Sequence, residues 1–184
     1  MWQRVKVILR NISSSISKTV FWLDYVRYLK KVGCENELVI FDLDNTLADT
    51  FPYLQNQNLK ELYSKVPIHI GMYKVFEECL LSKKNVIILS ARSFKYHAIT
   101  KKWIRMNLHE IREIPLFLVP RAEDKLPYLN KALEYATRIT YYDDLSYNHE
   151  NGEVKFYSNV ITELKKLRIT YIGYQEINKV NRNI

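Results

Sequence analysis

The chain has 184 residues, of which 47% are hydrophobic and 26% charged, a balance typical of one globular domain with a substantial core. Gly and Pro number only nine together, which argues against a long disordered segment, and no stretch approaches the roughly 20 apolar residues of a bilayer span. Of the net charge of +8, +5 lies in residues 1–36. Such a basic segment can attract anionic lipid, nucleic acid or an acidic partner.

Cysteine usage and the first residues indicate a cytoplasmic protein. The two cysteines, Cys34 and Cys79, show neither metal-ligand spacing nor a disulfide framework, which fits a reducing compartment. The opening sequence MWQRVKVILRNI scatters charges among its apolar residues and lacks the uninterrupted apolar region of a signal peptide. We therefore expect a cytoplasmic location.

Residues 1–36 predict a basic helical extension ahead of the domain. One helical face of residues 1–17 is apolar throughout: Trp2, Val5, Leu9 and Ile12. The polar sequence NISSSISK, residues 11–18, predicts a break, and residues 18–32 predict a second amphipathic helix that stops at Gly33. These helices could dock on the domain itself, on a partner protein or on a membrane surface.

Strand-like and helix-like segments alternate in the domain, which we place at residues 37–184. Short apolar runs predict six strands, at residues 37–41, 85–90, 115–119, 138–142, 154–158 and 168–172. Helical periodicity predicts the connecting helices, at residues 54–64, 72–82, 95–108, 124–136 and 160–167. This alternation is typical of an α/β fold with three Rossmann-like layers around a central, mainly parallel sheet.

Polar side chains stand at the ends of three predicted strands. Asp42 and Asp44 follow the first strand, Ser90 ends the second, and Asp143 and Asp144 follow the fourth. In open parallel sheets, ligands bind beyond the carboxyl ends of the strands. We therefore expect these five side chains to converge on one site.

The chemistry of such a cluster points to phosphoryl transfer. Several neighbouring carboxylates cannot stay ionised together without a cation, and hard oxygen ligands favour Mg²⁺. One carboxylate can act as a nucleophile and form an aspartyl-phosphate, while a second serves as general acid and then as base. A hydroxyl and a lysine can hold the transferring phosphoryl group.

Four segments resemble the motifs of the haloacid dehalogenase (HAD) superfamily of phosphotransferases. FDLDNT, residues 41–46, is similar to its first motif, and VIILSAR, residues 86–92, to its second. Lys125 opens the helix where the family places a lone lysine, and YYDDLSYN, residues 141–148, is similar to the fourth motif. The resemblance covers about residues 37–150.

The resemblance implies a role for each matching residue. Asp42 would be the nucleophile and a metal ligand, and Asp44 the general acid and base, with its backbone carbonyl also on Mg²⁺. Ser90 and Lys125 would bind the phosphate. Asp144 would be the metal ligand of the fourth motif.

Other positions near the motifs are less closely defined by the resemblance. Asp143 would support the metal directly or through water. Asn148 stands where the family pattern also allows Asp, and an Asn there can weaken or re-route one outer contact of the metal site. Arg92 could bind substrate phosphate, or it could make a surface ion pair. Lys131, deeper in its helix, is the alternative to Lys125.

The spacing of the motifs bears on the substrate. Only 45 residues separate Asp44 from Ser90 and 34 separate Ser90 from Lys125, which leaves room for a minimal helical cap at residues 51–84. An open site of this kind suits a bulky substrate: a phosphoprotein, a nucleic-acid end, or a lipid- or glycan-linked phosphate. Residues 90–108 also resemble the acid-phosphatase and polynucleotide 3′-phosphatase branches of the family.

We therefore expect a Mg²⁺-dependent phosphoric monoester hydrolase of the HAD type, acting through an aspartyl-phosphate. A polynucleotide 3′-phosphatase-like enzyme and a non-catalytic HAD-fold scaffold are the alternatives. A glycosyltransferase would leave Ser90 and Lys125 unexplained. A phospho-receiver domain would carry its phosphorylated Asp after the third strand, where this sequence has none.

Overall fold

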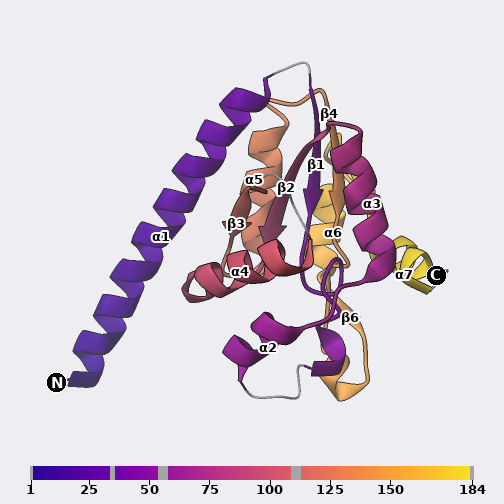
Figure 1. Ribbon diagram of the computed structural model, residues 1–184. Coiled ribbons are helices and arrows are strands. Elements are labelled where there is room, and N and C mark those ends of the chain that lie inside the picture. Colours follow the sequence, from indigo (N-terminus) through magenta and orange to yellow (C-terminus); the bar gives the residue numbers. More distant parts are fainter. Residues whose placement is uncertain (1, 34–35, 54–57, 109–112, 183–184) are drawn as a thin grey trace.

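The computed structural model describes residues 2–33, 36–53, 58–108 and 113–182, and its centre is a five-stranded sheet (Figure 1). The strands are β1 (Glu37–Phe41), β2 (Asn85–Ser90), β3 (Leu116–Leu118), β4 (Arg138–Tyr142) and β7 (Thr170–Ile172). They lie in the order β3-β2-β1-β4-β7, and every pairing is parallel. The expected α/β class with a Rossmann-like parallel sheet is confirmed.

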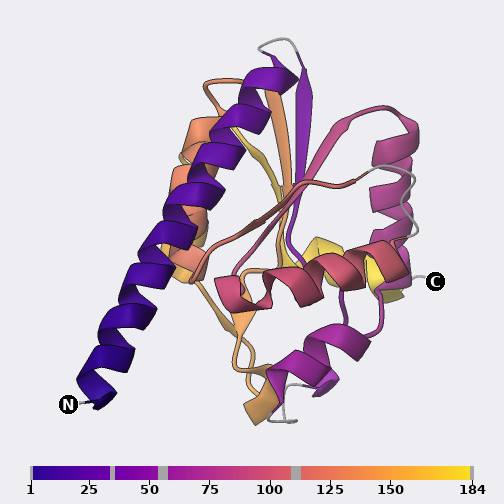
Figure 2. The same cartoon turned by 60° about the vertical axis from the view of Figure 1, so that its left-hand side comes forward.

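Helices cover both faces of this sheet and complete the three layers (Figures 1 and 2). One face carries α1 (Trp2–Val32), α5 (Lys125–Ala132) and α6 (Ser158–Leu164). The other carries α3 (Ile70–Leu81), α4 (His97–Asn107) and α7 (Tyr174–Arg182). Side chains alternate across a strand, so Leu38 and Ile40 of β1 enter the first core and Val39 and Phe41 the second. This burial on both faces explains the continuous apolar run of the central strand.

The N-terminal segment is a single helix, and the predicted break at residues 11–18 is wrong. Helix α1 runs without interruption for 31 residues. Ser and Asn are only modestly unfavourable inside a helix, and a packed second half lets the helix extend from an existing turn. The predicted stop is confirmed, because Gly33 takes a φ of 77° and donates its N–H to the Leu29 carbonyl. Among the described helices, α1 included, none combines the length and apolar content of a membrane span.

The second half of α1 contributes to the core of the domain. Tyr25 and Leu29 are fully buried in the cluster that contains Leu38 and Ile40. The Tyr25 hydroxyl also donates a hydrogen bond of 2.9 Å to the Tyr128 carbonyl in α5. The expected division at residue 36 therefore cuts through one hydrophobic core.

Replacing Leu29 with Ala tests this packing. We expect the free energy of unfolding to fall by about 2–4 kcal/mol, because the change leaves a cavity in a filled core. Leu23→Ala, at an exposed position of the same helix, is the matched control and should leave stability nearly unchanged. Urea unfolding of the two variants makes the comparison, and equal stability would contradict the packing described.

The C-terminal part differs from the sequence prediction in two ways. The predicted strand at residues 154–158 is wrong as a member of the sheet, because only β6 (Lys155–Phe156) is extended and it pairs antiparallel with β5 (Ser146–Tyr147). Both residues of β6 are exposed, so they have no buried face with which to join the sheet. The fifth strand of the sheet is β7, and it lies within the strand predicted at residues 168–172. Helix α7 was not predicted; among the described residues, Ile177 is its one fully buried residue.

The expected cap, residues 51–84, has two parts. Helix α3 packs Met72 and Phe76 against the sheet, so it belongs to an outer layer of the fold. Helix α2 (Leu59–Lys65) instead lies beyond the carboxyl ends of the strands (Figure 1). Residues 54–57 of the predicted helix at 54–64 lie outside the described residues, as does Cys34. Cys79 is a buried free thiol.

Candidate active site

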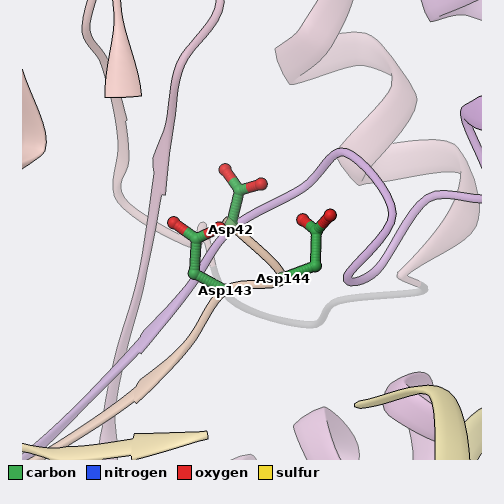
Figure 3. Close-up of side chains that lie close together, drawn as sticks. All are labelled: Asp42, Asp143 and Asp144. Carbon is green, nitrogen blue, oxygen red and sulfur yellow. The ribbon is translucent and has the colours of Figure 1, made fainter. Parts of the chain in front are cut away.

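Three buried carboxylates meet at the carboxyl edge of the sheet. Asp42 follows β1, and Asp143 and Asp144 follow its neighbour β4. One oxygen of each carboxylate lies within 4.8 Å of the others, and the three side chains point to the same side of their loops (Figure 3). The backbone N–H groups of Asp42 and Asp143 continue the ladder, donating to Tyr142 and Ile172. The sheet itself therefore fixes the spacing of the carboxylates.

A tight turn after β1 ties the two acidic loops together. Asn45 adopts a φ of 59°, a left-handed conformation that Asn tolerates better than most residues, and its N–H donates to the Ala48 carbonyl at 2.7 Å. The turn places Thr46 in full burial, where its hydroxyl accepts the Asp144 N–H at 3.4 Å. This contact locks the first acidic loop against the second.

One lysine faces the carboxylate cluster. Lys125, the first residue of α5, is buried with its Nζ atom 2.9 Å from Asp42 Oδ1 and 2.6 Å from Asp143 Oδ2. Although burial lowers the pKa of Lys125, the two carboxylates outweigh it and raise that pKa above its ordinary value. Lys131, the alternative, instead pairs with Glu134 at the surface. The structure thus brings Lys125, and not Lys131, to the site.

The other two carboxylates differ in how many donors they accept. Asp143 accepts hydrogen bonds from Lys125, from the Tyr141 hydroxyl and from the Leu145 N–H. Asp144 accepts one from the Ser146 hydroxyl. Asp143 is therefore held firmly by the protein, whereas Asp144 keeps free lone pairs for another ligand.

One lysine does not balance the charge of three carboxylates. Burial raises the pKa of Asp42 to about 7; Lys125 opposes this rise, while Asp143 and Asp44 add to it. Burial, and then Asp143 and Asp42, raise the pKa of Asp144 well above its ordinary value. A divalent cation bound to these oxygens would let all three carboxylates ionise at neutral pH. The donor set of buried carboxylate oxygens fits Mg²⁺.

Asp44 stands apart from this trio, in an ion pair with Arg92. The Arg92 Nε and Nη2 atoms donate to the two Asp44 oxygens at 2.8 and 2.6 Å, and the Thr50 hydroxyl donates to Oδ1 at 2.7 Å. Burial raises the pKa of Asp44, but Arg92 and Thr50 outweigh it and hold that pKa below its usual value. The Arg92 side chain is fully buried against the Tyr63 ring. Arg92 was expected at the substrate phosphate or in a surface ion pair; in the structure it makes a buried ion pair that neutralises Asp44, and its role at the phosphate stays a prediction.

Ser90 brings an unpartnered hydroxyl to the end of β2. Ser90 is fully buried, and among the described residues its Oγ atom has no hydrogen-bond partner. A buried hydroxyl without a partner is costly, so such groups commonly mark the place of a ligand or water. Because β2 lies beside β1, Ser90 stands next to the loop that carries Asp42.

The carboxylates open into a cavity of about 310 Å³, at the lower end of the range for ligand pockets. Its lining includes Asp42, Asp44, Lys125 and four aromatic residues: Phe51, Tyr63, Tyr147 and Tyr157. Asn148 lines it too, with a φ of 68°, but its amide bonds to Glu153 and Asn151 within the hairpin loop. Asn148 therefore shapes the wall and does not approach the carboxylates through those atoms.

Four polar residues of the site were missed from the sequence: Thr46, Thr50, Tyr141 and Ser146. Three of them lie inside the segments FDLDNT and YYDDLSYN, so their proximity to the acidic residues was a usable signal. Thr50 lies six residues from Asp44, and only the turn at Asn45 brings them together.

The fold and site together define an α/β protein with a Rossmann-like parallel sheet and a buried carboxylate cluster at its carboxyl edge. A scan against protein-family models found no model that matches the chain, and a search of the curated proteins also found no match. The chemistry of the site must therefore be inferred from its own geometry.

Proposed function

We propose that this chain is a Mg²⁺-dependent phosphatase of the HAD type, which hydrolyses a phosphomonoester through an aspartyl-phosphate on Asp42. The observation that carries this proposal is the buried trio of Asp42, Asp143 and Asp144 beside Lys125. The unpartnered hydroxyl of Ser90 adds a donor of the kind that a phosphoryl oxygen requires.

Asp42 and Asp144 would hold the cation, together with the backbone carbonyl of Asp44, and Asp143 would support them. When bound, Mg²⁺ would offset the charge of the carboxylates and of the phosphoryl oxygens. Lys125, already held by two carboxylates, would supply a further positive charge at the phosphate.

In the first step, a carboxylate oxygen of Asp42 attacks phosphorus and the bond to the leaving oxygen breaks. That oxygen takes a proton from Asp44. In the second step, water attacks phosphorus, gives its proton to Asp44, and releases inorganic phosphate from Asp42. The Arg92 pair holds Asp44 ionised, as the second step requires; in the first step the carboxyl group must carry a proton and turn from Arg92 toward the leaving group.

Hydrolysis of p-nitrophenyl phosphate by the purified full chain tests the proposal. We expect turnover with Mg²⁺, loss of turnover with EDTA, and recovery when Mg²⁺ is restored in excess. Calcium should support little turnover, because it is larger and its coordination more flexible. Calorimetric Mg²⁺ binding without turnover of any phosphomonoester would instead favour the non-catalytic scaffold.

One observation supports the second candidate, a polynucleotide 3′-phosphatase-like activity. The cavity wall carries the rings of Phe51, Tyr63, Tyr147 and Tyr157, and aromatic side chains are common stacking surfaces for nucleic-acid bases. A panel of 3′-phosphorylated oligonucleotides, nucleotides, sugar phosphates and phosphopeptides would separate the two. Preference for the oligonucleotides by kcat/KM supports this candidate, and equal rates on sugar phosphates contradict it.

A further inference from the structure

Helix α1 carries a second apolar face, opposite to the one that it buries in the domain. Ile16, Val20 and Leu23 are 60%, 50% and 55% exposed, whereas Tyr25 and Leu29 are fully buried. Successive residues turn by about 100° around a helix, so the three exposed positions share one side and lie roughly 180° from the buried pair. Ile16 and Leu23 therefore face away from the domain, and Val20 lies at the edge of the same side, where it also lines a groove between α1 and α4.

The same side of α1 is apolar at further positions toward its N-terminus. By their spacing in the sequence, the positions on this side are Trp2, Val5, Leu9 and Ile12. With 31 residues, α1 is about 46 Å long, and its N-terminal half projects away from the other elements in both views (Figures 1 and 2). Lys18, whose Nζ atom lies 3.5 Å from Asp124 Oδ1, joins the helix to the loop before α5. The sequence pattern on this side of the helix is thus apolar from residue 2 to residue 23.

The projecting half of the helix is a weak helix by its sequence and would be stabilised further by a surface outside the domain. Residues 11–17 are Asn, Ile and Ser, all of which are weaker helix formers than Ala or Leu. Isolated helices shorter than about 12–15 residues are marginal in water even with better sequences. A surface that covers the outer apolar side would supply this stabilisation.

Charge indicates which kind of surface this is. Residues 1–23 contain no acidic residue and four basic ones, Arg4, Lys6, Arg10 and Lys18, of which Lys18 pairs with Asp124 of the domain. A second copy of the helix would bring the same positive charge against it, whereas an anionic membrane offers negative headgroups and an apolar layer together. We propose that α1 lies flat on an anionic lipid surface, with the side of Ile16, Val20 and Leu23 toward the lipid. This inference is independent of the proposed phosphatase activity.

Flotation of the full chain with lipid vesicles tests the proposal. We expect it to float with vesicles of equimolar phosphatidylcholine and phosphatidylserine, but not with phosphatidylcholine alone. High salt should weaken binding, because it screens the basic residues from the headgroups. The triple variant Ile16→Gln, Val20→Gln, Leu23→Gln should lose vesicle affinity by at least about tenfold, since three apolar side chains no longer enter the lipid.

A matched variant controls for exposed apolar residues in general. Ile70→Gln, Leu81→Gln, Met106→Gln changes three comparably exposed residues on α3 and α4 and should bind vesicles like wild type. Circular dichroism should show helix content rising with anionic vesicles in wild type and not in the α1 variant. Equal flotation of both triple variants would overturn the proposal. The proposal would also be overturned if sedimentation showed a wild-type dimer that does not bind vesicles, together with a monomeric α1 variant. That outcome would identify a second copy of the chain as the partner.

Discussion

Replacing Asp42 with Asn is expected to abolish turnover of p-nitrophenyl phosphate, by on the order of a thousandfold or more, while the fold is retained. The amide has nearly the same shape as the carboxylate, but it cannot attack phosphorus. Lys125 keeps Asp143 as its ion-pair partner, and loss of the Asp42 charge relieves repulsion with Asp143 and Asp144, so the free energy of unfolding in EDTA should not fall. Steady-state kinetics with Mg²⁺ and urea unfolding in EDTA measure the two effects separately.

Asp49→Asn is the control for this substitution. Asp49 lies on the same loop, but it is half-buried, and His69 is its charge partner among the described residues, 3.7 Å away. Its replacement should leave turnover and stability close to wild type. Full activity of the Asp42 variant would show that another group attacks phosphorus, and the aspartyl-phosphate mechanism would have to be abandoned.

Replacing Lys125 with Met should produce the largest loss of stability of any single change at the site. The ammonium contacts Asp42 and Asp143 in a buried setting, and its removal leaves the carboxylates uncompensated. Breaking one partner of a buried ion pair typically costs about 3–5 kcal/mol. We expect a loss of this order in urea unfolding with EDTA, and turnover should also fall because a charge at the phosphate is missing.

A second substitution distinguishes charge from packing. In the double variant Lys125→Met, Asp143→Asn, part of the lost stability should return, because one of the uncompensated carboxylates is gone. Lys131→Met, at the surface end of the same helix, should be close to wild type. If the double variant is no more stable than Lys125→Met alone, the lysine acts by filling space and the electrostatic account fails.

The central strands could be predicted well because their patterns are strong. Glu37–Phe41 and Asn85–Ser90 were predicted with the boundaries that the structure gives, since apolar runs buried on both faces are distinctive. The single helix Trp2–Val32 could not be predicted, because its second half gains stability from Tyr25 and Leu29 in a core formed by distant segments. Local propensity at residues 11–18 contains no information about that packing.

The site was predictable as a list of residues but not as a set of contacts. The position of Asp42, Asp143 and Asp144 at adjacent strand ends followed from the parallel sheet. The pairing of Arg92 with Asp44 did not, because the two residues are 48 positions apart and a buried arginine is unusual. Which of two nearby carboxylates an arginine neutralises depends on turns such as that at Asn45, which sequence spacing does not specify.

The contact between Tyr25 and Tyr128 has a consequence for how the protein is made. The two residues are 103 positions apart, so the first helix emerges from the ribosome long before its partner in α5. The same delay applies to β1, because its partner strand β4 and Lys125, which contacts Asp42, are both synthesised much later. Contacts of such sequence separation form slowly, and apolar surface stays exposed meanwhile. The carboxylate cluster is therefore completed only when most of the chain has been synthesised.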